Sequence, residues 1–382
     1  MSRERHVDEP WEVEENARIA SLRGVARLDP LWQIAQRRGE LGDTDGKLRW
    51  LKKFLSVTTA EAVFDQKIRA VAEIRRMYES DPAHPKLRHD ALWYYKWLAE
   101  DMPEYTDVPL ATIDQYFNDM EAFYRSAREP LGPIYSIRCE AALVMGRKEE
   151  ADRWYEKWQQ TPRGKLDDCA ACVAARQMKY HIEGDRDAEA LAAAEPILKG
   201  KSWCEETPAA ITLLIGLLKR KGLDRAVVLI LKACGKPVRK TPNFLSALGV
   251  HVLQNFFTGN IVRSRRLAIV GLDRSRKIKS EYHQYNFYRN CGVWAAVAAI
   301  ASAKAAIPNL SIPRKYLPRA DAADTARAEL PEVAATCLEA ARQIGIRFDT
   351  RNGNSRYVER LQQLEEVIRK MVRAMEQSDR PI

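Results

Sequence analysis

The sequence predicts an all-α protein, a right-handed solenoid of paired antiparallel helices with a long C-terminal capping helix. Three observations support this fold class. Gly146, Gly184, Gly222 and Gly259 recur at intervals of 38, 38 and 37 residues. Apolar residues recur at helical spacing on both sides of these glycines, and no segment shows the sustained alternation of a strand. A fixed period of this length is typical of helical repeats.

Residues 1–130 are expected to form helical repeats of less regular period. Apolar side chains recur at helical spacing over 58–80, 87–101 and 109–128. The segments end at Asp81-Pro82, Met102-Pro103 and Glu129-Pro130. Proline disfavours the helical conformation in the residue before it, so each pair marks a boundary.

Residues 131–279 are expected to hold the regular repeats, with each glycine between the first and second helix of a pair. Glycine adopts a positive φ without steric cost, which suits the end of a helix. After Gly146, the residues Ala151, Trp154 and Trp158 fall on one helical face. Such a stripe is the side that a helix buries against its neighbours.

Residues 280–382 are expected to form C-terminal helices and the cap. A proline-rich interval at 307–319 reads as a loop. Beyond the turn-forming pair Asn352-Gly353, apolar residues step by four and three, at Tyr357, Leu361, Leu364, Ile368, Met371 and Met375. A last helix that shields the final repeat is the expected role, and a dimer helix is the alternative. Asp349 and Arg351 either hold this turn against the preceding helix or form a charged recognition site.

Two strings resemble the turn between helices in the tetratricopeptide family. They are Met145–Ala151 and Lys221–Ala226, and the resemblance spans residues 131–279. The period exceeds the 34 residues of that family, and most of its signature positions are absent.

Three further strings, in the same order, resemble a group of bacterial tetratricopeptide-like proteins without an established activity. They read DCxxC, CxExP and FDxRNG, at Asp168–Cys172, Cys204–Pro208 and Phe348–Gly353. The resemblance implies a helical repeat fold and no particular chemistry.

The positive charge is concentrated in one part of the chain. The net charge is +10, and residues 201–300 alone carry 17 basic and 5 acidic side chains, a balance of +12. If one helix continues through Gly271, it brings four cations to one side, namely Arg263, Arg266, Arg274 and Lys277. Such a surface attracts an acidic partner or phosphate, or is simply a solvated face.

Aromatic residues follow this basic block and leave two interpretations open. Tyr285, Phe287 and Tyr288 are interleaved with cations such as Arg289. Aromatic and basic side chains together bind single-stranded nucleic acid through stacking and phosphate contacts. The alternative is that these rings form the core of the next helix.

The seven cysteines are an odd number and favour a reducing, cytoplasmic setting over a disulfide framework. Cys169, Cys172 and Cys204 all fall at the start of the first helix of a pair, so they can share one edge. Three thiolates with a fourth ligand suit zinc. Structural packing and a redox pair are the alternatives, and His181 lies too far along its helix to be the fourth ligand.

No catalytic signature, nucleotide-binding glycine motif, secretory signal or membrane-length apolar run is found in the sequence. We therefore expect a non-catalytic cytoplasmic interaction protein that holds a peptide or partner protein, acidic rather than basic, in a positive groove. Its partner-binding residues would be Arg263, Arg266, Arg274, Lys277, Tyr285 and Arg289. The alternatives are nucleic-acid binding by the basic block and a zinc or thiol site at the three cysteines. No other cofactor is expected.

Overall fold

The structure is a computed structural model that describes residues 9–304 and 310–377. It is all-α, as expected, with neighbouring helices packed against each other. None of the described helices is long and apolar enough to cross a membrane. The chain separates into two compact units, residues 1–98 and 99–382, with the division inside one helix. The three-part division of the sequence at residues 130 and 279 stays a prediction.

The smaller unit contains four helices and most of a fifth. They are α1 (Pro10–Ser21), α2 (Leu28–Glu40), α3 (Thr44–Ala60), α4 (Phe64–Ser80) and α5 (Pro85–Asp101), with the 3-10 turn η1 (Gly24–Arg27) after α1. Glu12 of α1 is fully buried, where it accepts hydrogen bonds from Arg38, Arg49 and Trp50. A buried carboxylate is tolerated because these donors replace its water, and they fix α1 onto α2 and α3.

The larger unit begins with the end of α5 and continues through helix pairs. Its elements up to the last pair are η2 (Met102–Glu104), α6 (Leu110–Ser126), α7 (Gly132–Met145), α8 (Lys148–Gln160), α9 (Ala170–Glu183), α10 (Asp187–Leu198), α11 (Thr207–Thr212), α12 (Leu214–Arg220), α13 (Asp224–Lys240), η3 (Pro242–Phe244), α14 (Leu245–Phe257) and α15 (Ile261–Ser275). Its last part contains α16 (Glu281–Lys304), β1 (Ile312–Pro313), η4 (Arg314–Tyr316), β2 (Arg327–Ala328), α17 (Leu330–Asn352) and α18 (Arg356–Gln377).

The turns inside the four regular pairs share one backbone arrangement. In each, one residue has a positive φ, and the next N–H donates to the carbonyl five residues earlier. Gly146, Gly222 and Gly259 are the positive-φ residues, as the sequence predicts. At the second turn the prediction is wrong by one residue, because Gly184 has φ −97° and Asp185 has φ 54°. Aspartate is among the few other residues that visit this region.

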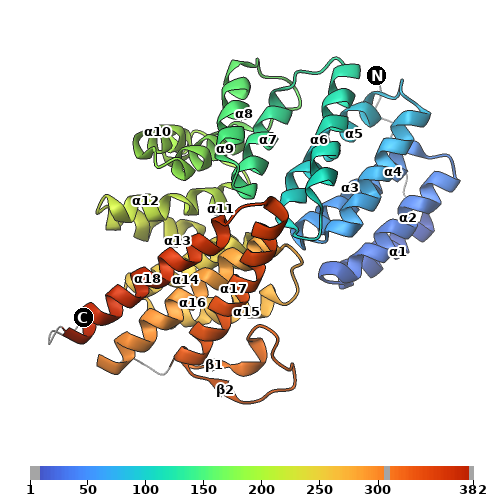
Figure 1. Cartoon of the computed structure of the whole chain (residues 1–382). Helices are drawn as coiled ribbons and strands as arrows, with labels where there is room; N and C mark the ends of the chain where they lie inside the picture. The colour runs from blue at the N-terminus through green and yellow to red at the C-terminus, as the bar shows by residue number, and fades with distance from the viewer. Residues whose placement is uncertain (1–8, 305–309, 378–382) are drawn as a thin grey trace. The chain divides into compact units, whose positions relative to one another are not determined.

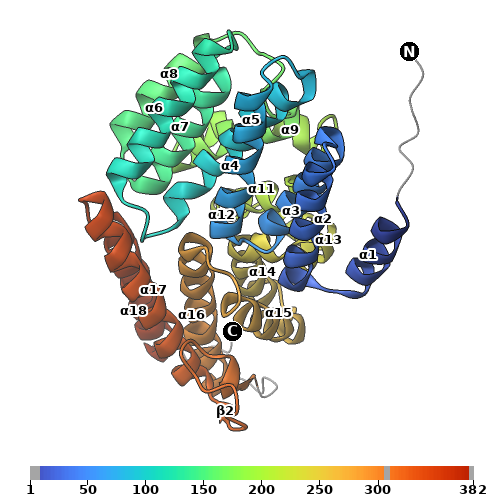
Figure 2. The same ribbon diagram turned by 90° about the vertical axis from the view of Figure 1, so that its right-hand side faces the viewer.

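Successive pairs pack side by side along the chain. The two helices of each pair contact each other, and the first helices α7, α9, α11, α14 and α16 contact one another in that order. The first helix of the third pair is interrupted at Leu213, which separates α11 from α12. Figure 1 shows this succession from green to orange, and Figure 2 shows α6, α7 and α8 side by side.

Gly271 continues α15 instead of ending it. A Cβ atom at Gly271 would lie 2.1 Å from Cε2 of Phe287 on α16. The missing side chain therefore lets α15 approach the buried Phe287 ring closely.

The segment between α16 and α17 contains a small departure from the all-helical prediction. β1 and β2 pair antiparallel, with Ile312 opposite Ala328. Arg265 of α15 donates to the Ser311 carbonyl, with N–O distances of 3.0 and 2.9 Å, and thereby fixes the described part of this segment.

The C-terminal helices do more than shield the last pair. α18 packs on α17 and α16, with Leu364 and Ile368 against Val293 and Val297 (Figure 1). The side chains of Met371 and Met375, also expected on this seam, lie outside the described ones. The turn before α18 and its first residues also bind α7, at the far end of the helix pairs: Asn354, Arg356 and Tyr357 donate to the carbonyls of Met145, Leu143 and Val144.

Candidate functional site

The structure brings the three predicted cysteines together. Cys169 is the N-cap of α9, Cys172 lies one turn on, and Cys204 lies three residues before α11. Their sulfur atoms all lie within 4.8 Å of one another, and Cys172 Sγ is 3.5 Å from Cys204 Sγ. This convergence follows from the sequence spacing, because the starts of α9 and α11 are neighbours.

The start of α9 makes the three thiols unequal. Burial opposes ionisation of Cys169, but hydrogen bonds from the Cys172 and Ala171 N–H groups and from the neighbouring thiols lower its pKa below the ordinary value. Burial, with the nearby Cys204 and Cys169, raises the pKa of Cys172 well above its ordinary value. Cys169 is exposed, so the thiol whose pKa is lowered is also the most accessible of the three.

Surrounding side chains position these thiols without joining them as ligands. Thr207 accepts a hydrogen bond from the Cys204 N–H at 2.9 Å, and its hydroxyl lies 3.4 Å from the Cys204 sulfur. The Asp168 carboxylate is held by Arg176. Among the described residues, no histidine or carboxylate joins the three sulfurs in one ligand group. His181 instead contacts the Tyr155 hydroxyl at 3.0 Å and Arg186 at 3.1 Å.

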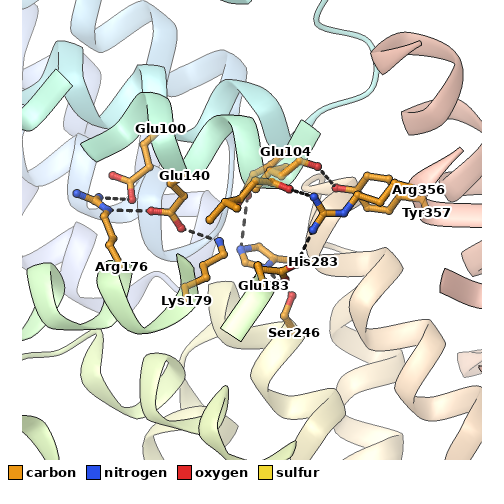
Figure 3. Close-up of polar contacts among 12 residues, drawn as sticks. Glu100, Glu104, Glu140, Arg176, Lys179, Glu183, Ser246, His283, Arg356 and Tyr357 are labelled. Atoms are coloured by element: carbon orange, nitrogen blue, oxygen red, sulfur yellow. Dashed lines mark hydrogen bonds and ion pairs between the residues drawn. The ribbon is translucent and has the colours of Figure 1, made fainter. Parts of the chain in front are cut away.

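A second cluster of charged side chains lies between α5, α7 and α9 (Figure 3). Arg176 donates to Glu100 at 2.5 Å and to Glu140 at 2.8 Å, and Lys179 donates to Glu140 at 2.7 Å. Burial opposes ionisation of Glu140, but Lys179 and Arg176 hold its pKa well below the usual range. Glu100 shares Arg176 with other carboxylates, and burial raises its pKa.

The same cluster continues as a chain of polar contacts from η2 to α14. Glu104 accepts a hydrogen bond from Ser280 at 2.9 Å and lies 3.5 Å from Nε2 of His283. Nδ1 of His283 lies 2.8 Å from the Ser246 hydroxyl. Burial raises the pKa of Glu104 to about 7 and lowers the pKa of His283 to about 4.

Serine, histidine and carboxylate are also the residue types of a hydrolase triad. A general base works best with a pKa near the working pH, and an imidazole with a pKa of about 4 takes a proton poorly. The contacts of Glu104, His283 and Ser246 join η2, α16 and α14.

No protein-family model matches this chain, and searches of curated proteins and of solved structures each found no match.

Nine of the 17 basic residues in 201–300 lie on α13 and α15, the second helices of their pairs. Between residues 232 and 266, six cations of α13 and α15 are exposed and have no ion pair among the described residues: Lys232, Lys236, Arg239, Lys240, Arg263 and Arg266. We call these six the basic surface. The two helices are neighbours, because Arg274 of α15 donates to the Thr241 carbonyl after α13 at 2.9 Å. Gly235 of α13 leaves room for Arg263, since a Cβ there would lie 2.3 Å from its guanidinium.

The expected positive groove stays a prediction, and the cations of the basic surface lie on second helices. The first helix α14 contains no lysine or arginine, and α9 contributes to the mixed cluster with its carboxylates. The glycine register of the sequence already places Arg263 and Arg266, which follow Gly259, in the second helix of a pair.

The other predicted binding residues have partners within the chain, and Lys277 remains exposed. Arg274 satisfies carbonyls at the end of α13, and Lys277, beyond the end of α15, pairs with Asp273 at 2.6 Å. Tyr285 is buried and donates to the Tyr357 carbonyl at 2.7 Å, and Arg289 lies over the Tyr285 ring. Phe287 and Tyr288 are buried as well. The aromatic residues after the basic block therefore form core.

Arg351 and Asp349 hold the turn before α18. Asp349 accepts hydrogen bonds from the backbone N–H groups of Tyr357 and Val358 at 2.9 Å, and so caps α18. Arg351 donates to the Pro103 carbonyl at 2.9 Å. Of the two roles open from the sequence, these contacts give both residues the structural one.

Proposed function

We propose that this chain is a non-catalytic interaction protein of the tetratricopeptide-like solenoid type, which binds an acidic partner protein or peptide on its basic surface. The observation that carries the proposal is the basic surface itself, whose six cations are exposed and have no ion pair in the described part of the chain. Cations that lack partners keep their electrostatic field, which attracts a surface of opposite charge.

The partner is expected to be a protein and not single-stranded nucleic acid. Sequence-tolerant binding of single strands needs aromatic platforms next to the cations. Tyr285, Phe287 and Tyr288, the aromatic residues that follow the basic block, are buried in α16. Phosphate contacts alone give weak binding that disappears as salt rises.

The test compares two charge reversals in the full-length chain. One variant carries Lys232→Glu, Lys236→Glu and Arg266→Glu on the basic surface. The control carries Lys148→Glu, Arg153→Glu and Lys165→Glu, at exposed positions around α8. Both change the net charge by the same amount, so they separate a local surface from a general charge effect. Proteins recovered with the wild type are identified, purified and titrated against all three chains.

We expect the affinity of the purified partner to fall by at least about tenfold in the first variant, since several contacts of about 0.2–1 kcal/mol are lost and reversed. The control should bind as the wild type does. Equal losses in both variants would contradict a local site. Tight binding of a labelled oligonucleotide at physiological salt, abolished only by the first variant, would replace the protein partner by a nucleic acid.

A further inference from the structure

We propose that Cys169, Cys172 and Cys204 bind one zinc ion, with the fourth coordination position open to water or to a ligand from solution. This site is separate from the basic surface and does not depend on the proposed partner.

The first argument is the geometry of the sulfurs. Zinc binds thiolates at about 2.3 Å, so the sulfurs of a tetrahedral site are about 3.8 Å apart. Here Cys172 Sγ and Cys204 Sγ are 3.5 Å apart, and all three sulfurs lie within 4.8 Å of one another. Each sulfur needs to move by only a fraction of an ångström to reach a common ion. Thiolates suit zinc and other thiophilic ions more than hard cations such as Mg²⁺.

The second argument is the number of thiols. A disulfide uses two cysteines and core packing uses buried ones, and neither explains three converging thiols of which one is exposed. A disulfide between Cys172 and Cys204 would leave Cys169 without a role. Cys169 is exposed, so its position is not explained by filling the core. A cation at the centre uses all three sulfurs and favours the ionised form of each.

The third argument concerns the supports of the ligands. Cys169 is the N-cap of α9, and Cys172 lies one turn on in the same helix, so one rigid element carries two of the ligands. The buried Thr207 hydroxyl accepts a hydrogen bond from the backbone N–H of Cys204 and so holds Cys204 in place. Metal ligands are usually oriented by such outer contacts.

The fourth position is left open because the nearby groups have other partners. Asp168 is bound to Arg176, and His181 is bound to Tyr155 and Arg186. Three protein ligands with an open position are the arrangement of zinc sites that bind an external ligand, whereas structural sites are closed by four.

The first experiment uses the wild-type chain alone. The reduced, metal-free protein is titrated with Zn²⁺ and with Co²⁺, and the reactivity of its thiols is measured with a thiol reagent. We expect one ion per chain, thiolate-to-cobalt charge-transfer absorption, and slower reaction of the exposed thiol when zinc is present. A reduced chain that takes up no ion and shows no protection of thiols would overturn the proposal.

The second experiment assigns the ligands. Cys169→Ala, Cys172→Ala and Cys204→Ala are compared with Cys234→Ala, a buried thiol on α13. Since loss of an outer support already weakens metal binding by about 10–100-fold, loss of a ligand should weaken it by more than about 100-fold. Thr207→Val, which removes an outer support, should weaken zinc binding by about 10–100-fold. The Cys234 variant should bind zinc as the wild type does.

Circular dichroism of each metal-free variant shows whether it is folded. If the ligand variants do not fold, the titration of the wild-type chain still shows whether the protein binds zinc. Equal zinc affinity in all four cysteine variants would refute the assignment. So would a chain whose thiols, once reduced, form the Cys172–Cys204 disulfide at the same rate with zinc present as without it.

Discussion

At the scale of single residues, Glu104 and His283 link the stability of the larger unit to pH. The two side chains are 3.5 Å apart, and burial shifts both toward the neutral form. Glu104 also faces Lys179, Glu140 and Glu100, and His283 faces Asp101 and Lys179. Because folding raises the pKa of the acid Glu104 and lowers the pKa of the base His283, their contributions to stability change with pH in opposite directions.

The sign of each contribution follows from its two pKa values. The folded state keeps the proton of Glu104 up to about pH 7, and the unfolded carboxyl releases it near 4.5. This contribution is full below pH 4.5 and is lost as the pH rises to 7. In the folded state, His283 is protonated only below about pH 4, whereas the unfolded imidazole is protonated below about pH 6.5. That contribution is full above pH 6.5 and is lost as the pH falls to 4.

We predict that replacing either residue leaves the pH dependence of stability that the other residue causes. In His283→Gln, the free energy of unfolding should fall as the pH rises from 4.5 to 7. In Glu104→Gln, it should fall as the pH drops from 6.5 to 4. Each change should be at most about 3 kcal/mol, since one pKa unit is about 1.4 kcal/mol. Urea unfolding at several pH values measures both, with the exposed Glu156→Gln as the control. Parallel pH profiles for the two variants would contradict this account.

At the scale of helices, the turn glycines and the interior glycines do different work. Gly222 and Gly259 end their helices with a positive φ and have no atom near the position of a Cβ. Gly271 has an ordinary helical backbone, but its Cβ position is occupied by the Phe287 ring. Glycine is required at the turns because of the positive φ. At Gly271 it is required because the two helices lie too close for a side chain.

We predict opposite effects for alanine at two helical glycines. Gly271→Ala should destabilise the chain by about 1–3 kcal/mol, because the buried Phe287 ring must shift to admit a methyl group. Gly216→Ala on α12 meets no atom within 4 Å and should stabilise the chain by about 0.5–1 kcal/mol through helix propensity. Thermal or urea unfolding measures both. A Gly271→Ala chain as stable as the wild type would show that α15 and α16 are not held this closely.

The helices themselves were largely predictable, because their signals are local. The glycine period located the four turns, and at Gly184 it missed by one residue only because aspartate also tolerates a positive φ. The spacing of Cys169 and Cys204 from their glycines correctly predicted that the thiols share one edge. In these cases the deciding interactions lie within one helix pair or between adjacent pairs.

At the scale of the whole larger unit, the decisive contacts join distant parts of the chain and have no local signal. Glu104 and Ser280 are 176 residues apart, and Tyr357 and Val144 are 213 residues apart. The heptad spacing predicted the helix α18 but not the surfaces it would meet. The spacing of the basic residues likewise indicated their helix but not which of them are paired inside the chain: Arg274 donates to the Thr241 carbonyl, 33 residues earlier.

The contacts of α18 imply that the larger unit is closed on itself by its C-terminal segment. Asn354 and Tyr357 donate to the Met145 and Val144 carbonyls at 2.8 and 2.6 Å, at the end of α7. Arg356 also pairs with Glu183 of α9 at 2.6 Å. The last carbonyls of a helix have no partner within it, so these side chains satisfy α7 while they fix α18.

We predict that Tyr357→Phe loosens α7, although the substitution lies more than 200 residues from it. The change leaves the ring in place and removes the hydroxyl, so the buried Val144 carbonyl loses a donor, at a cost of about 1–3 kcal/mol. Hydrogen exchange measured by mass spectrometry should then be faster in peptides from 132–145 under native conditions. Tyr316→Phe is the matched control, because its hydroxyl has no hydrogen bond among the described residues. If exchange in 132–145 is the same in both variants, α7 is held without the C-terminal segment, and the larger unit is an open array of pairs instead of a closed one.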